Sequence, residues 1–148
     1  MASQALTILR DQLHRKEQQA VAEFTQARQQ LLSFEHQLTQ LETYRRSYME
    51  QSLARGADGI LASGFHQYQA FIQTIEKAES DQQQSVGRLR TNVQQKRQQW
   101  LELQTRRKAI EQLQQRQLQK VAHKMARDEQ KLLDEYATLR FARQHNPL

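Results

Sequence analysis

Residues that interrupt helices are scarce in this sequence and are gathered in one short segment. Gly56, Gly59 and Gly64 are three of the four glycines and lie close together, while the single proline, Pro147, is next to the last residue. Sheet proteins and doubly wound enzymes need many turns, and glycine and proline are the main residues that make them. The sequence therefore excludes those classes and predicts an all-α chain with one internal connection.

The segments on either side of the glycines have the composition of long helices. They are rich in Gln, Leu, Ala, Glu, Arg and Lys, which are all good helix formers. Hydrophobic residues make up only 37% of the chain, below the roughly 45–50% of ordinary globular domains. We expect one coiled-coil domain over 1–148, with a helix over about 3–54, a connection over 55–63 and a second helix over about 64–143.

Residues at alternating steps of three and four are mostly apolar in both predicted helices. The first series is Phe24, Ala27, Leu31, Phe34, Leu38, Leu41, Arg45 and Tyr48, and the second is Phe65, Tyr68, Ile72, Ile75, Glu79, Gln82, Val86, Leu89, Val93, Lys96, Trp100 and Leu103. This spacing is typical of the contact face of a coiled coil. The short connection favours an antiparallel hairpin. Pairing between two separate chains is the alternative.

A turn centred between Gly59 and Ile60 sets the register of such a hairpin, because facing residues then have numbers that sum to about 119 or 120. The expected pairs are Val86 with Phe34, Leu89 with Leu31, Trp100 with Ala20, Tyr44 with Ile75, and Tyr48 with Phe71. Two interpretations of the cluster that this register forms from Tyr44, Tyr48, Phe71 and Ile75 stay open. The cluster is either a thickened core or a surface on which another protein docks.

The same register leaves the end of the second helix without a partner, from about residue 116 to 143. Positive charge is concentrated there, since residues 88–131 carry twelve Lys/Arg against four Asp/Glu, whereas residues 1–87 carry eight against ten. Five cations share one helical face: Arg116, Lys120, Lys124, Arg127 and Lys131. They are either a solvated face or a binding site for an acidic protein, nucleic acid or a membrane surface. An acidic protein is favoured.

Neither catalytic nor cofactor-binding chemistry is predicted. The chain has no cysteine, its five histidines are scattered, and no glycine-rich phosphate loop is present. Two thin helices also provide no deep pocket in which to tune reactive groups. We therefore expect no enzyme activity, no catalytic residues, no cofactor and no metal site. No long apolar run or signal-like N-terminus is seen, so a cytoplasmic protein is expected.

Residues 68–78 read YQAFIQTIEKA, and they follow Leu38, Leu41, Tyr44 and Tyr48 at helical spacing. With the chain length and the two-helix plan, these residues resemble the flagellar export protein FliJ family over essentially the whole chain. Two positions depart from that resemblance. Glu79 stands where relatives tend to have an apolar residue, and Gln82 stands where some have histidine.

The resemblance implies a non-enzymatic central stalk or adaptor of the flagellar type III export apparatus. Implied partners are the hexameric export ATPase, the cytoplasmic domain of the export gate and the export chaperones, with no nucleic acid. The implied location is cytoplasmic, peripheral to the inner membrane at the flagellar base. The residues that the resemblance assigns to the gate-contacting face are Gln37, Leu41, Tyr44, Tyr48, Phe71, Ile75 and Ala78.

We further expect both termini, with the five cations, to enter the ATPase ring while the turn end points to the gate. Two alternatives remain at this stage. One is a generic cytoplasmic coiled-coil scaffold or a basic rod associated with nucleic acid, and the other is the equivalent stalk of a virulence secretion system.

Overall fold

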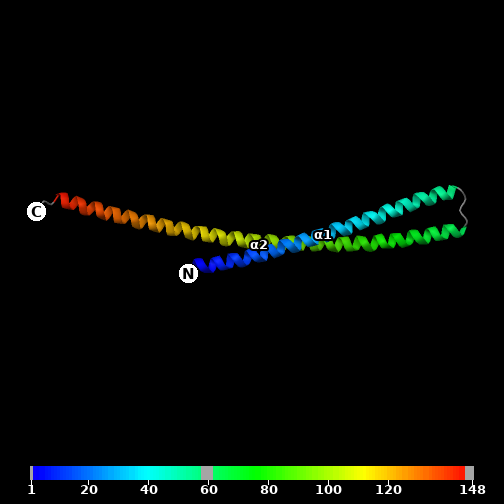
Figure 1. The fold of residues 1–148 in the computed structure, drawn as a ribbon, viewed down its shortest axis with the longest axis horizontal. Coiled ribbons are helices and arrows are strands. Elements are labelled where there is room, and N and C mark those ends of the chain that lie inside the picture. The colour runs from blue at the N-terminus through cyan, green and yellow to red at the C-terminus, as the bar shows by residue number, and fades with distance from the viewer. Residues whose placement is uncertain (1, 58–61, 146–148) are drawn as a thin grey trace. The chain divides into compact units, whose positions relative to one another are not determined.

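A computed structural model describes residues 2–57 and 62–145 of the chain, and these residues form two α-helices (Figure 1). Helix α1 covers Ala2–Ala57 and α2 covers Ala62–His145. Each helix extends a few residues beyond the bounds expected from sequence, and Gly56 lies in the last turn of α1. The expected turn centre at Gly59 and Ile60 lies outside the described residues. The all-α, two-helix antiparallel hairpin is confirmed for the part of the chain that is described.

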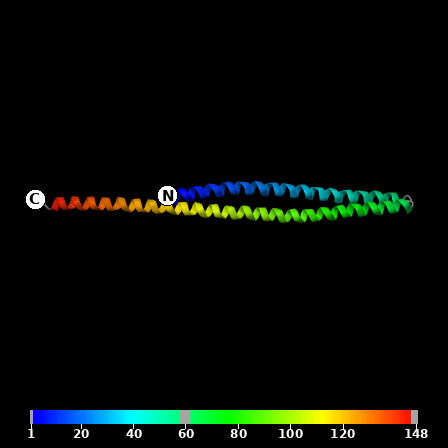
Figure 2. The ribbon, with the colours of Figure 1, turned by 90° about the horizontal axis from the view of Figure 1, so that it is seen from below.

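The chain divides into two compact units, one made of Glu17–Glu102 and the other of Met1–Lys16 with Leu103–Leu148. In the first, hereafter the turn unit, the cyan part of α1 lies beside the green part of α2 (Figures 1 and 2). Its most buried apolar side chains are Ala20, Ala27, Ile75 and Val86. Among the described residues no large side chain is less than 2% exposed. This is expected where each helix has only one neighbour to cover it.

Contacts across the turn unit test the predicted register. Tyr48 packs on Phe71 with ring centroids 4.2 Å apart, and Lys96 Nζ lies 3.3 Å from Glu23 Oε2. Both pairs fit the register expected from the sequence. Trp100 was expected opposite Ala20; its ring stacks on Phe24, one helical turn further along α1, with centroids 5.7 Å apart.

In the second unit, hereafter the terminal unit, the first turns of α1 pack on the middle of α2. Leu13 is buried there at 7% exposure, and Leu6 and Ile110 are half-buried. From residue 118 to residue 145 every side chain of α2 is exposed. The yellow-to-red part of α2 accordingly continues past the beginning of α1 (Figure 1). The predicted overhanging segment of the second helix is therefore present.

Candidate protein-binding surfaces

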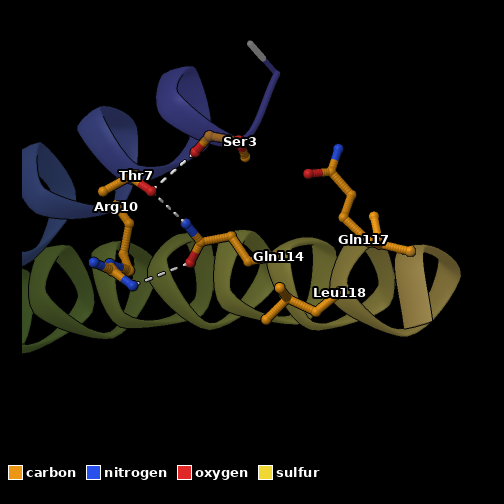
Figure 3. Close-up of a pocket in the computed structure, with 7 residues that line it drawn as sticks. Ser3, Thr7, Arg10, Gln114, Gln117 and Leu118 are labelled. Atoms are coloured by element: carbon orange, nitrogen blue, oxygen red, sulfur yellow. Dashed lines mark hydrogen bonds between the residues drawn. The ribbon is translucent and has the colours of Figure 1, made fainter. Parts of the chain in front are cut away.

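A recess of about 420 Å³ marks the place in the terminal unit where α1 begins. It is lined by Ser3, Thr7 and Arg10 from α1 and by Gln114, Gln117, Leu118 and Val121 from α2. Gln117 and Leu118 extend from α2 beyond the first turn of α1 (Figure 3). The recess is thus the point at which the face of α2 that contacts α1 becomes uncovered.

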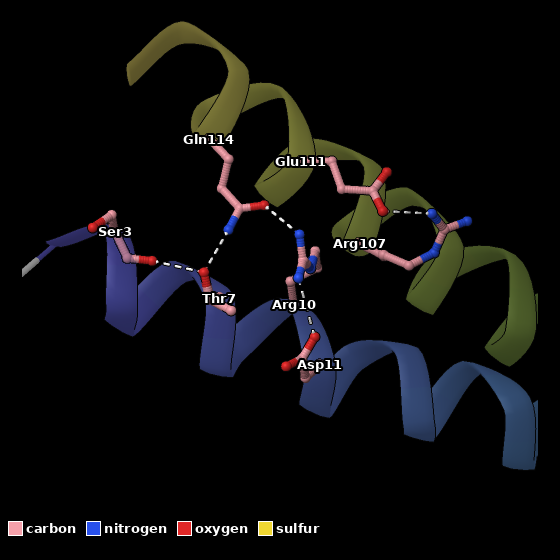
Figure 4. Close-up of polar contacts among 7 residues, drawn as sticks. All are labelled: Ser3, Thr7, Arg10, Asp11, Arg107, Glu111 and Gln114. Carbon is pink, nitrogen blue, oxygen red and sulfur yellow. Dashed lines mark hydrogen bonds and ion pairs between the residues drawn. The ribbon is translucent and has the colours of Figure 1, made fainter. Parts of the chain in front are cut away.

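Gln114 ties α1 to α2 at this recess (Figure 4). Its Nε2 donates to Thr7 Oγ1 at 3.1 Å, and its Oε1 accepts from Arg10 Nη1 at 3.2 Å. Thr7 Oγ1 in turn donates to the carbonyl of Ser3 at 2.9 Å, and Arg10 Nη2 lies 3.4 Å from Asp11 Oδ1. One side-chain amide therefore uses its donor and its acceptor to fix the position of the first turns of α1. Sequence reasoning missed Gln114, because one glutamine out of 28 carries no distinguishing signal.

Beyond the recess, α2 exposes an apolar stripe. It consists of Leu118, Val121, Met125, Leu132 and Leu139, which are between 56% and 71% exposed. Exposed apolar side chains are common one at a time, but a row of them on one helical face indicates a contact surface. The apolar stripe therefore has the spacing of a coiled-coil face without its partner.

The five cations predicted to share a face are all exposed and form a second, basic stripe: Arg116, Lys120, Lys124, Arg127 and Lys131. Lys120, Lys124 and Arg127, together with His123, line one shallow hollow on the surface of α2. Acidic residues follow directly, since Asp128, Glu129, Asp134 and Glu135 occur within eight positions. The overhang thus combines a positive block, a negative block and an apolar stripe.

An aromatic cluster lies in the turn unit, where the two helices approach the connection. Tyr48 contacts two rings of α2, and its centroid lies 5.7 Å from that of Tyr68 and 4.2 Å from that of Phe71. Tyr44 meets the edge of Phe71 at 5.8 Å and stays 56% exposed. Three of the residues assigned to the gate face are therefore in contact with one another. Tyr68 joins them, although it was placed only in the apolar series and in the segment 68–78, and not in the gate face.

The other residues of the predicted gate face differ in accessibility. Ile75 is only 4% exposed and belongs to the core, while Leu41 and Ala78 are half-buried. Gln37 is exposed, and its Oε1 accepts a hydrogen bond from Gln82 Nε2 at 3.1 Å. The accessible part of this face is therefore formed by Tyr44 and Gln37, with the half-buried rings beside them.

A polar layer separates the aromatic cluster from the apolar seam that follows. Glu79, one of the two departures from the resemblance given in the sequence analysis, is 8% exposed and is paired with Arg45. Gln82, the second departure, donates to the backbone carbonyl of Phe34 at 3.0 Å as well as to Gln37. Both polar residues in the seam thus have partners on α1, and the carbonyl contact sets the register of the two helices at this level.

No group of three or more His, Asp or Glu side chains in the described part of the chain is arranged to hold a metal ion. Within those same ranges, neither helix contains a stretch apolar enough to cross a membrane.

Comparison with known proteins gives one family. The sequence profile described as flagellar FliJ protein matches residues 2–146. The flagellar FliJ protein of Escherichia coli strain K12 is 29% identical over 133 residues, which cover 90% of this chain and 90% of that protein. No solved structure matches. The resemblance first seen around residues 68–78 therefore holds over nearly the whole sequence.

Proposed function

The chain belongs to the flagellar FliJ protein family, and we propose that it acts as a non-enzymatic stalk or adaptor of the flagellar type III export apparatus. Its partners in this role are the hexameric export ATPase, the cytoplasmic domain of the export gate and the export chaperones. The protein works on the cytoplasmic side, peripheral to the inner membrane at the flagellar base.

One observation carries the ATPase contact. The end of α2 runs past the beginning of α1 and presents both the basic stripe and the apolar stripe to solvent. A partner with acidic side chains around an apolar groove complements both stripes at once. The terminal unit is therefore the part of the chain that engages the ATPase.

The dimensions of helices support a place inside a ring. One α-helix with its side chains is ~10–12 Å across, so a segment of one or two helices is slender enough for the central pore of a hexamer. A single helix pair lacks six-fold symmetry and meets the six subunits unequally. Unequal contacts stabilise different subunit conformations to different extents, which is how a stalk biases the nucleotide states of a ring.

The aromatic cluster is the proposed contact with the export gate. Tyr44 is more than half exposed and rests on the half-buried ring of Phe71, which in turn touches Tyr48. Large aromatic side chains dominate the free energy of many protein interfaces. Ile75 contributes indirectly in this proposal, because it is buried and supports the rings rather than reaching a partner.

Charge reversal tests the ATPase contact. The test variant carries Glu in place of Lys120, Lys124, Arg127 and Lys131. Its binding to the purified export ATPase and its stimulation of ATP hydrolysis are measured. We expect both to fall at least tenfold. A matched control reverses four exposed cations elsewhere on α2, which are Arg88, Arg97, Arg106 and Lys108. Equal losses in the two variants, or none in the first, contradict the assignment.

A further inference from the structure

We propose that two copies of this chain pair with each other, antiparallel, through residues 118–142 of α2. The observation behind this proposal is the apolar stripe, whose side chains are all more than half exposed. It does not require the ATPase contact proposed above, but it uses the same overhang, so the two partners compete for these residues.

The overhang contains two interleaved series of residues seven positions apart. The first is Leu118, Met125, Leu132 and Leu139, and the second is Val121, Asp128, Glu135 and Ala142. Alternating steps of three and four join the two series into one face, which is the face that a coiled-coil partner covers. Six of the eight residues are apolar, and the other two are carboxylates.

Those two carboxylates point to a second copy of this chain as the partner. In the arrangement described next, the residue that faces each carboxylate has a lysine as its neighbour in the sequence. In an antiparallel pair with Leu118 opposite Ala142 of the second copy, Lys131 lies next to Asp128 of the second copy. Lys124 lies next to Glu135 of the second copy in the same way. Both contacts occur twice because the pair is two-fold symmetric. All four carboxylates in the shared face therefore meet a lysine of the other chain.

The outer layers of this arrangement are apolar, whereas each inner layer pairs a carboxylate with an apolar residue. Val121 faces Leu139 of the second copy, and Leu118 faces Ala142. Asp128 and Glu135 lie across from Leu132 and Met125 of the second copy, against which their methylene groups can pack. Every side chain of α2 from residue 118 to residue 145 is exposed. The paired segment begins at the first of these residues. The pair thus covers the uncovered face from the recess almost to the last described turn.

Two other arrangements fit less well. A parallel pair in register places Asp128 against Asp128 and Glu135 against Glu135, and like charges that face each other are destabilising. In an antiparallel pair shifted by seven residues, Met125 faces Asp128 of the second copy. Glu135 then lies beside Gln117 of the second copy instead of beside a lysine. The shift also directs the last turns of each helix toward the first turns of α1 in the other copy.

The expected pair is weak and sensitive to salt. Ion pairs at an exposed helix interface contribute little each and are screened as ionic strength rises. We expect a dissociation constant in the range of roughly 10 μM at low salt, increasing severalfold at high salt. Pairing covers Lys124 and Lys131, so a ligand of the basic stripe competes with it.

Sedimentation velocity and equilibrium on the full-length protein, from 1 to 200 μM, test the proposal. Two adjacent leucines of similar exposure provide a matched pair: Leu132 lies on the shared face at 66% and Leu133 lies off it at 63%. We expect Leu132→Ala to raise the dissociation constant at least tenfold and Leu133→Ala to change it less than twofold. A protein that is monomeric at 200 μM, or a dimer that both variants affect alike, overturns the proposal.

Charge exchange and cross-linking test the register. Lys131→Glu should weaken pairing severalfold, and adding Asp128→Lys to the same chain should restore it, because each contact joins one residue from each copy. The chain has no cysteine, so introduced thiols report specific contacts. A mixture of Asp128→Cys and Leu132→Cys chains should form mixed disulfides. Disulfides of Asp128→Cys with itself, or with Met125→Cys in preference to Leu132→Cys, overturn the arrangement.

Discussion

Arg45 Nε lies 2.8 Å from Glu79 Oε1 within the turn unit, so an ion pair occupies a position in the seam between the helices. The Glu79 side chain is 10% exposed and that of Arg45 is 37% exposed. At this short distance neither atom forms an aligned hydrogen bond, so the contact is an attraction between charges. Water reaches the arginine and weakens that attraction. The pair therefore specifies which residues face each other more than it adds stability.

Replacement of Arg45 alone should destabilise the turn unit. Arg45→Leu leaves the Glu79 carboxylate nearly buried without its cation, and we expect a loss of about 1–2 kcal/mol in the free energy of unfolding. The double variant Arg45→Leu with Glu79→Leu should recover that loss, because the seam then becomes apolar throughout. Urea unfolding followed by circular dichroism at 222 nm measures both changes. A double variant less stable than the unchanged protein would show that the pair is a net stabilising interaction.

Trp100 offers a second test of the packing in the turn unit. Its ring stacks on Phe24 at an interplanar angle of 28°, and its Nε1 is buried without a hydrogen-bond acceptor. Trp100→Phe keeps the ring contact and removes the unsatisfied donor, so stability should change by less than about 0.5 kcal/mol. Trp100→Ala should cost about 2 kcal/mol, because the contact with Phe24 is lost. Thermal unfolding of the two variants beside the unchanged protein provides the measurement.

The fluorescence of Trp100 gives an independent check, since it is the only tryptophan. Its emission should shift to longer wavelength together with the loss of helical signal during unfolding. Emission typical of an exposed indole in the folded protein would contradict the stacked position on Phe24.

The two helices and the pairing of Tyr48 with Phe71 were predictable because they depend on periodicity, which is a local property of the chain. Steps of three and four define the contact face, and the single cluster of glycines sets the pairing of Tyr48 with Phe71. The pairing of Arg45 with Glu79 was not predicted, although both residues were placed in the seam. Long side chains reach beyond the residue directly opposite, and the direction in which they reach depends on the local packing of both helices.

The candidate surfaces were only partly predictable for a different reason. The basic stripe and the overhang follow from charge and helix length, and both are present. Ile75, however, is assigned to the gate face by resemblance, and its 4% exposure places it in the core. A helical repeat gives the face on which a residue lies, but the neighbouring helix decides how much of its side chain stays accessible.

Gly87 is the one glycine within the long regular part of α2, and its replacement should stabilise the protein. A Cβ atom at this position would meet nothing within 4 Å. Gly87→Ala should therefore raise the free energy of unfolding by about 0.5–1 kcal/mol, because alanine loses less backbone freedom on forming a helix. A rise in the urea midpoint at unchanged slope is the expected result. A fall in the midpoint would indicate that another chain or helix approaches Gly87 in solution.

Removing Gln114 should loosen the first turns of α1 without unfolding the turn unit. Gln114→Ala deletes the hydrogen bonds to Thr7 and Arg10, each of which contributes about 0.5–1.5 kcal/mol. Hydrogen exchange should become faster for the amides of residues 5–12 and stay unchanged for residues 20–50. Gln115→Ala is the matched control, since Gln115 is exposed and adjacent. Faster exchange throughout α1 would show that the two units unfold together.

The last prediction concerns the aromatic cluster as the gate contact. Combined replacement of Tyr48 and Phe71 by Ala removes the rings that support Tyr44 and should lower affinity for the cytoplasmic domain of the export gate by at least tenfold. Both positions are only half-buried, so helical content measured by circular dichroism should be unchanged. Tyr136→Ala with Phe141→Ala is the matched control, because those rings are 66% and 61% exposed in the terminal unit. Gate affinity that survives the first pair of changes, or that falls equally with the second, places the contact elsewhere on the chain.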